Sequence, residues 1–106
     1  MMQRVCFLLK VKQSMIDDYK RAHASVWPEM LDALRQCGWR NYSLFLRPDG
    51  LLVGYLETLD FDQALAGMKK HPINEKWQKA MRGYFEGMDG MADEGMAPLE
   101  EVFHLQ

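Results

Sequence analysis

Two side chains that could exchange protons lie four residues apart near the start of the chain, Tyr19 and His23. In an α-helix, side chains at this spacing project next to each other from one face. An imidazole gains or loses a proton near neutral pH, because its unperturbed pKa is about 6.5. A neighbouring phenol can orient a hydroxyl-bearing ligand or share in the proton transfer. The pair therefore indicates acid–base chemistry, although an inert, half-buried histidine is the commoner explanation for His23 taken alone.

Aromatic residues could supply the wall of a binding site around this pair. Trp27 follows His23 by one helical turn, Trp77 falls in a later helical segment, and Tyr42 opens a strand. Aromatic rings with few charges suit flat, partly apolar ligands, and sugars offer an apolar C–H face to a stacking ring. Core packing is the competing explanation: it is favoured for Trp39, whereas for Trp77 and Tyr42 both explanations stay open.

Other kinds of site have weak support in the sequence. His71 precedes a proline in a connection between helices, and His104 lies near two glutamates without the spacing of a metal site. We find no phosphate-binding loop, no dinucleotide fingerprint and no GxSxG motif. We therefore expect neither a metal nor an organic cofactor.

The elements that must position these residues follow from the periodicity of the apolar side chains. Alternation from Val5 to Val11 predicts a strand covered on both sides. A helical stripe then runs from Met15 to Leu34, but Pro28 cannot lie in the middle of a helix. We expect a break at residues 24–27, with Pro28 in the first turn of a second helix.

The second half of the chain predicts a hairpin, two short helices and a last strand. The expected elements are a strand from Tyr42 to Leu46, a turn at Arg47–Gly50, a returning strand LLVGYLE, a helix after Asp60, a helix from Pro72 that carries Trp77, a glycine-rich loop at Gly87–Pro98, and a strand from Leu99 to Leu105.

This order, βαββαβ, predicts an α+β fold of the ferredoxin-like type, with helices on one face of a four-stranded antiparallel sheet. The opposite face would still carry apolar side chains, from Cys6, Leu8, Phe45 and Val53. A small domain usually buries such a face against a partner. We therefore expect a homodimer whose sheets face each other, a dimeric α/β-barrel.

Composition limits the class of protein further. The 106 residues suffice for a single domain spanning residues 1–106. A formal net charge of −2 with scattered lysines and arginines argues against a nucleic-acid groove. The longest apolar run is too short to span a bilayer, so we expect no membrane partner. Two cysteines are too few for a disulfide framework, which favours a cytoplasmic, reduced protein.

Several segments together resemble one family, the L-rhamnose mutarotases. They are YKRAHASVWPEM, RNYSLFLRPDG, GYLE, the KW before QKAM, and the terminal LEEVFHL. The similarity runs from the first strand to the last residues, and the combination of HxxxWPEM with a terminal EVFHL is specific. The resemblance implies a small dimeric α/β-barrel of the ferredoxin-like type.

The resemblance also implies an activity and the residues that perform it. Members of the family interconvert the α and β anomers of L-rhamnose without a metal or an organic cofactor. The family's catalytic acid matches His23, which would protonate the ring oxygen, and its substrate-contacting tyrosines match Tyr19 and Tyr42. Its tryptophan-containing pair matches Trp77 and Gln78, where some relatives have two adjacent tryptophans, so less stacking is available in this chain.

Two other functions fit the same architecture, because a fold does not determine a function. One is a non-enzymatic dimeric module that binds or senses a sugar. The other is a cofactor-free monooxygenase acting on an electron-rich aromatic substrate. Without the resemblance, the residues alone would support these three functions about equally well.

Overall fold

A three-stranded antiparallel sheet forms one layer of the protein in the computed structural model, which describes residues 2–86 and 95–106. The strands are β1 (Gln3–Lys10), β2 (Arg40–Leu46) and β3 (Leu51–Thr58), in the spatial order β1-β3-β2. Both neighbours of β3 run antiparallel to it. The central strand is therefore β3, and β1 and β2 flank it.

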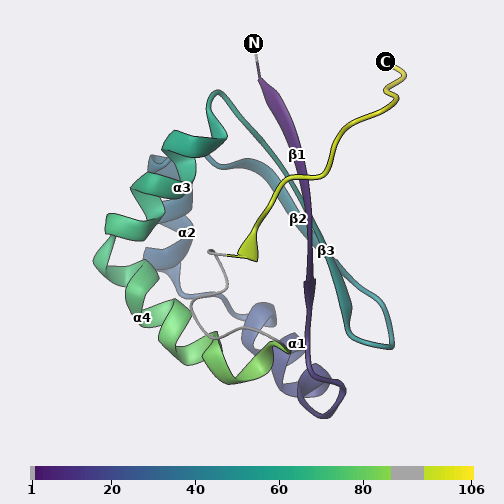
Figure 1. The fold of residues 1–106 in the computed structure, drawn as a ribbon. Coiled ribbons are helices and arrows are strands. Elements are labelled where there is room, and N and C mark those ends of the chain that lie inside the picture. The colour runs from purple at the N-terminus through teal and green to yellow at the C-terminus, as the bar shows by residue number, and fades with distance from the viewer. Residues whose placement is uncertain (1, 87–94) are drawn as a thin grey trace.

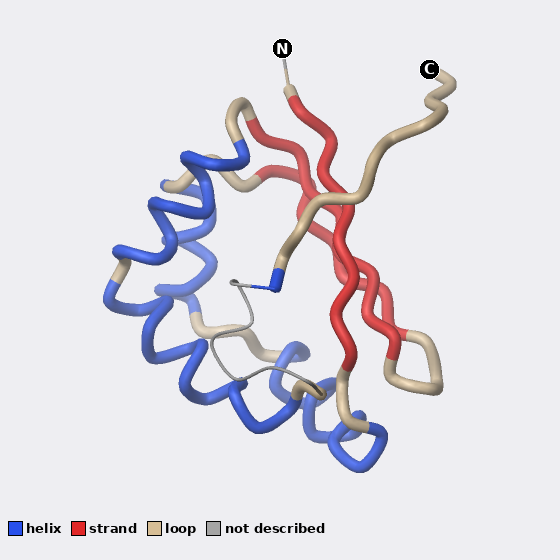
Figure 2. Tube along the Cα trace, in the orientation of Figure 1, coloured by secondary structure: helices blue, strands red, loops and turns tan. Residues whose placement is uncertain are grey.

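Four α-helices cover one face of this sheet, as Figures 1 and 2 show. They are α1 (Ile16–Ala24), α2 (Pro28–Gln36), α3 (Phe61–Lys70) and α4 (Pro72–Met81), with short 3-10 turns at Gln13–Met15 and Arg82–Tyr84. The predicted α+β class with helices on one face is thus confirmed.

The helical stripe is broken before Pro28, as predicted. The first helix stops at Ala24, and Pro28 is the first residue of α2. Trp27 has extended backbone angles (φ −56°, ψ 133°) just before the proline, the conformation that a following proline favours. The proline lacks a backbone N–H, which costs nothing in the first turn, where no carbonyl of the helix would receive it. The bend changes the direction of the chain directly after His23.

The predicted hairpin between β2 and β3 is also confirmed. The backbone N–H of Gly50 donates to the carbonyl of Arg47 at 2.8 Å, and Gly50 has a φ of +100°. A glycine takes this left-handed conformation without steric cost. A second glycine, Gly54 in β3, makes room for a neighbour: a Cβ at this position would lie 2.2 Å from Cζ of Phe7.

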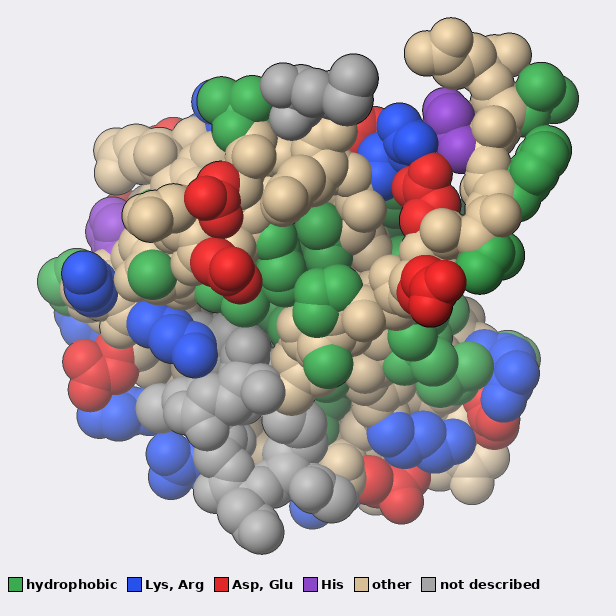
Figure 3. All heavy atoms as spheres, turned by 45° about the horizontal axis from the view of Figure 1, so that its top comes forward, with side chains coloured by type: hydrophobic (Ala, Val, Ile, Leu, Met, Phe, Trp, Pro, Cys, Tyr) green, Lys and Arg blue, Asp and Glu red, His purple; other side chains and the backbone are tan. Residues whose placement is uncertain are grey.

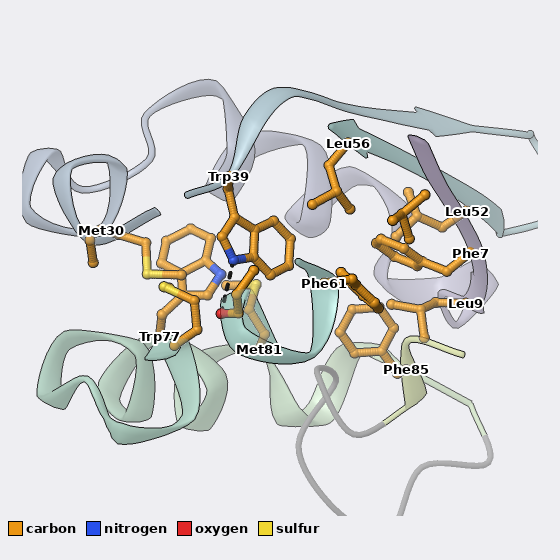
Figure 4. Packing of buried hydrophobic residues seen from close by; sticks show 14 of the residues in the cluster. Phe7, Leu9, Met30, Trp39, Leu52, Leu56, Phe61, Trp77, Met81 and Phe85 are labelled. Carbon is orange, nitrogen blue, oxygen red and sulfur yellow. Dashed lines mark hydrogen bonds between the residues drawn. The ribbon is translucent and has the colours of Figure 1, made fainter. Parts of the chain in front are cut away.

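The core fills the space between the sheet and the helices. Alternate strand residues point into it, among them Phe7, Leu52 and Leu56, which are almost completely buried. Figure 4 shows how these side chains meet aromatic residues from other elements, including Trp39. The indole Nε1 of Trp39 donates to the backbone carbonyl of Ala64 at 3.2 Å. The prediction that Trp39 belongs to the core is therefore confirmed.

The other face of the sheet carries the apolar side chains that the alternation predicted. Cys6 and Val53 are half-buried, whereas Leu8 is 42% and Phe45 62% exposed. In the register of the sheet, Leu8 and Phe45 are the two neighbours of Val53 across the ladder. An apolar patch thus crosses all three strands on the side away from the helices.

The prediction of a fourth strand from Leu99 to Leu105 is wrong, because these residues form no strand in the structure. The start of this segment does lie beside β1, because the N–H of Leu99 donates to the carbonyl of Cys6 at 2.7 Å and Glu101 pairs with Arg4 at 2.6 Å. The following residues form no ladder, and Figures 1 and 3 show the tail leaving the body of the molecule. Its alternating apolar side chains, 79–86% exposed at Val102, Phe103 and Leu105, find nothing to pack on within one chain.

One further predicted element, the glycine-rich loop at Gly87–Pro98, falls mainly on residues 87–94, which lie outside the described residues. Within the described residues, no helix is both long enough and apolar enough to cross a bilayer.

Candidate active site

A cavity of about 340 Å³ lies between the helices and the inner face of the sheet. Its size falls within the range of small-molecule sites, about 300–1,000 Å³. Every strand and every helix contributes at least one side chain to its lining. The five candidate site residues all line this one cavity: Tyr19, His23, Tyr42, Trp77 and Gln78. Trp27, which the sequence also offered for the wall, is not among the lining residues and packs against Trp77 instead.

The rings of Tyr19 and His23 stack on each other at one end of α1. Their centroids lie 4.1 Å apart with an angle of 27° between the planes. Tyr19 is 4% exposed, and the imidazole is half-buried. The expectation that the i and i+4 side chains lie side by side is thus confirmed, and both face the same cavity.

A backbone hydrogen bond selects the tautomer of His23. Its Nδ1 lies 3.0 Å from the carbonyl oxygen of Tyr19. A carbonyl oxygen can only accept, so Nδ1 carries a proton and Nε2 holds the lone pair in the neutral ring. Burial lowers the pKa of His23 below its usual 6.5, and the bond to the Tyr19 carbonyl opposes this shift in part. At neutral pH the imidazole is therefore mainly uncharged.

The two tyrosines of the cavity keep their protons. Desolvation raises the pKa of Tyr19 and also that of Tyr42, which the nearby Tyr19 raises further. The ring of Tyr42 packs on Trp39 at a centroid distance of 4.9 Å. Both phenols are thus neutral hydroxyl groups over the physiological range, able to donate and accept hydrogen bonds but not to act as phenolate bases.

Trp77 belongs both to the core and to the wall of the cavity. Its ring meets His23 edge to face at 5.4 Å and meets Trp27 in the same way at 5.0 Å. Only 7% of the residue is exposed. Figure 4 shows it beside Met30, Met81 and Trp39, which also line the cavity. Trp77 is therefore a core residue that also lines the cavity, and its contact with a ligand stays a prediction.

The sequence reasoning missed Asn74, which is buried in the same wall. Nε2 of Gln78 donates to Oδ1 of Asn74 at 3.2 Å, and the two residues are 6% and 3% exposed. A signal was available in the sequence: Asn74 precedes Gln78 by four residues and so shares its helix face.

The described lining of the cavity is uncharged near neutral pH. Within the part of the chain that the structure describes, no lysine, arginine, aspartate or glutamate lines the cavity. The other two histidines lie elsewhere. His71 caps α4 by accepting from the N–H of Ile73 at 3.4 Å, and His104 is exposed in the tail. The described residues also hold no cluster of three or more potential metal ligands. A ligand that is neutral, partly apolar and able to form a few hydrogen bonds matches this lining.

Comparison with known proteins points to one family. The family model described as L-rhamnose mutarotase matches residues 4–105. A relative from Oceanobacillus iheyensis with that description is 35% identical over 107 residues, covering 98% of this chain and 99% of its own. A relative from Bacillus subtilis, described in the same words, is 31% identical over 105 residues with the same coverage.

A solved structure agrees in fold. The crystal structure of an L-rhamnose mutarotase from Formosa agariphila superposes with a TM-score of 0.78 at 24% sequence identity. The alignment covers 98% of this chain and 99% of the other.

Proposed function

Because the chain belongs to the L-rhamnose mutarotase family, we propose that its cavity binds L-rhamnose and interconverts the α and β anomers. The observation that carries this proposal is the lining of the cavity. A stacked imidazole and phenol lie in a space of about 340 Å³ that has apolar, aromatic and neutral polar walls. L-Rhamnose is uncharged and carries a methyl group in place of a hydroxymethyl group, so it matches walls of this kind.

The reaction needs one proton to move between two oxygens of the sugar. Ring opening breaks the bond between the anomeric carbon and the ring oxygen, removes the proton of the anomeric hydroxyl and places a proton on the ring oxygen. The aldehyde end then rotates about its bond to the next carbon, and the ring closes on the other face of the carbonyl. Both oxygens are bonded to the anomeric carbon, so one well-placed group can serve both.

We assign this proton transfer to Nε2 of His23. Nδ1 of His23 donates its proton to the carbonyl of Tyr19, so Nε2 carries the lone pair. The lowered pKa of His23 keeps the ring neutral at the start, and Nε2 can therefore take the proton of the anomeric hydroxyl. The resulting imidazolium then protonates the ring oxygen, which is the acid step expected from the sequence. Closure of the ring reverses both transfers and returns the imidazole to its neutral form. General acid–base help of this kind contributes roughly a hundredfold to ten-thousandfold.

The other four residues would hold the sugar in place. Tyr19 and Tyr42 keep their protons and can hydrogen-bond to sugar hydroxyls. Trp77 offers an apolar surface next to His23, on which the C–H face of the sugar can pack. Gln78 offers an amide, which can both donate and accept.

The activity can be measured directly on the sugar. Saturation-transfer NMR follows the exchange between the two anomeric protons of L-rhamnose, and micromolar protein should accelerate it well above the rate in buffer. A protein that binds L-rhamnose, seen as broadened sugar signals, but leaves the exchange rate unchanged would be a sensor or binding module. That result would contradict the enzymatic proposal.

We further propose that two copies associate through the outer faces of their sheets as a dimeric α/β-barrel. The apolar patch around Leu8, Phe45 and Val53 supports this, because water-exposed apolar surface is stabilised by burial against a partner. The tail supports it too. Its exposed Phe103 and Leu105 lie on either side of His104, the spacing of one strand face, and would gain a packing surface from a second copy.

Replacing Phe45 by glutamate should disrupt this association. A carboxylate at the centre of an apolar interface loses its water without gaining a partner, so we expect dimerisation to weaken at least tenfold. Sedimentation velocity at several concentrations measures the change. Leu59→Glu is the matched control, because Leu59 is 72% exposed in the bend after β3, outside the sheet. A dimer that survives Phe45→Glu unchanged would contradict this interface.

A further inference from the structure

Two side-chain amides hold each other in a fixed orientation in the wall of the cavity. Nε2 of Gln78 donates to Oδ1 of Asn74 at 3.2 Å, and both residues are less than 7% exposed. Among the described residues, no buried side-chain nitrogen or oxygen lacks a hydrogen-bond partner. Turning the Gln78 amide by 180° would bring its oxygen against Oδ1 of Asn74, so that two acceptors would face each other. For the orientation of the Asn74 amide in this structure, the contact therefore selects one orientation of the Gln78 amide.

This orientation matters because the described lining of the cavity offers hydrogen-bonding groups and apolar surface but no lysine, arginine, aspartate or glutamate. The phenols of Tyr19 and Tyr42 can rotate their O–H bonds to suit a ligand, whereas an amide has a donor and an acceptor at fixed edges. With its nitrogen directed at Asn74, Gln78 places its carbonyl oxygen at the other edge of the amide group. A sugar hydroxyl next to this wall would therefore face the donor and the acceptor of the Gln78 amide in fixed positions.

We propose that Asn74 is a positioning residue that sets the sugar preference of the site through Gln78. Asn74 fixes the amide, and the fixed amide favours a 6-deoxyhexose with hydroxyl groups in one arrangement over one that differs at a single carbon. The inference rests on the function proposed above and identifies a determinant of its substrate range. His23 has no part in it, so the effect falls on binding and not on proton transfer.

A double-mutant cycle separates this role from simple packing. The four proteins are the wild type, Asn74→Leu, Gln78→Leu and the double variant. Leucine has nearly the shape of asparagine but cannot accept a hydrogen bond. NMR titration gives the affinity for L-rhamnose independently of turnover, and saturation transfer gives KM and kcat. The same titrations with a 6-deoxyhexose that differs at one hydroxyl-bearing carbon measure discrimination.

Asn74→Leu should weaken binding of L-rhamnose about three- to tenfold, the effect of one net hydrogen bond. KM should rise by the same factor, kcat should stay within about threefold of the wild type, and discrimination between the two sugars should fall. In the Gln78→Leu background, Asn74→Leu should change affinity less than about twofold, because the amide through which Asn74 acts is gone.

The control is Glu75→Leu, which removes an exposed pair with Lys79 (3.2 Å) at the same spacing on the same helix. It should leave affinity and KM unchanged. If Asn74→Leu does not fold, Asn74→Ala enters the same cycle. Equal effects of the Asn74 substitution with and without Gln78, or a loss confined to kcat, would overturn the role of Asn74 while leaving the proposed function intact. A wild type that neither binds nor interconverts L-rhamnose would overturn both.

Discussion

Replacing His23 by alanine lowers kcat/KM for anomer exchange by about a hundredfold to ten-thousandfold, if Nε2 of this residue carries the proton. The variant loses the proton carrier but leaves the neighbouring walls in place, so sugar binding should change much less than turnover. Saturation-transfer NMR on L-rhamnose gives the rate, with the spontaneous reaction in water as the baseline.

His71→Asn is the matched control for this substitution. It also removes a histidine, but asparagine can still cap α4, where His71 now accepts from Ile73. Thermal melting should show both variants folded. Full activity in His23→Ala would move the proton transfer to another group.

The pH profile supplies an independent check on the same nitrogen. Burial lowers the pKa of His23, so the neutral ring needed at the start persists to a pH below 6.5. The rate should therefore be constant near neutrality and fall as the pH drops through this lowered pKa. A rate that instead increases as the pH drops through it would mean that the imidazolium is the starting form.

The second large effect is expected for Trp77→Ala, on both stability and binding. Trp77 is 7% exposed and packs edge to face against His23 and Trp27. Truncating a buried tryptophan typically lowers the free energy of unfolding by about 3–5 kcal/mol, a large share of what a small domain has. The same change removes the apolar surface next to the imidazole, so KM for L-rhamnose should rise at least tenfold.

Trp77→Phe separates the two contributions. It keeps a ring in the core and should recover most of the stability, while the smaller surface should still raise KM by a few-fold. Chemical denaturation and NMR kinetics on the two variants give both quantities. If Trp77→Ala destabilises the protein but leaves KM unchanged, the tryptophan serves the core alone.

Local signals in the sequence determined where most elements begin and end. Pro28 placed the break between α1 and α2, because a proline fixes its own backbone and removes a donor from a helix. The turn at Arg47–Gly50 placed the hairpin. These rules act between residues close in sequence, so no knowledge of distant parts of the chain was needed.

The last strand shows where such local reasoning fails. The alternation from Leu99 to Leu105 is real, but a strand also needs a neighbour along its length and a surface for its side chains. Within one chain, the tail contacts β1 at Leu99 and at Glu101 and then departs. Alternation in a sequence says which faces are apolar, and not what covers them.

The sequence by itself predicted five candidate site residues, and for Tyr19 and His23 also the shared helix face on which they lie. Tyr19 and His23 were predicted to be neighbours from their helical spacing, and Tyr42 and Trp77 were candidates for an aromatic wall. The resemblance to a family added Gln78 and implied a role for all five residues. The tertiary structure decided that all five line one cavity and that burial lowers the pKa of His23 and raises that of Tyr42. The contacts of His23 with the Tyr19 carbonyl and of Gln78 with Asn74 each join residues four apart on one helix, so the spacing allowed them and the structure showed that they form. The reason is physical: periodicity assigns a side chain to a face, whereas a cavity, and the burial that shifts the pKa of a residue in its wall, arise only when distant segments pack against one another.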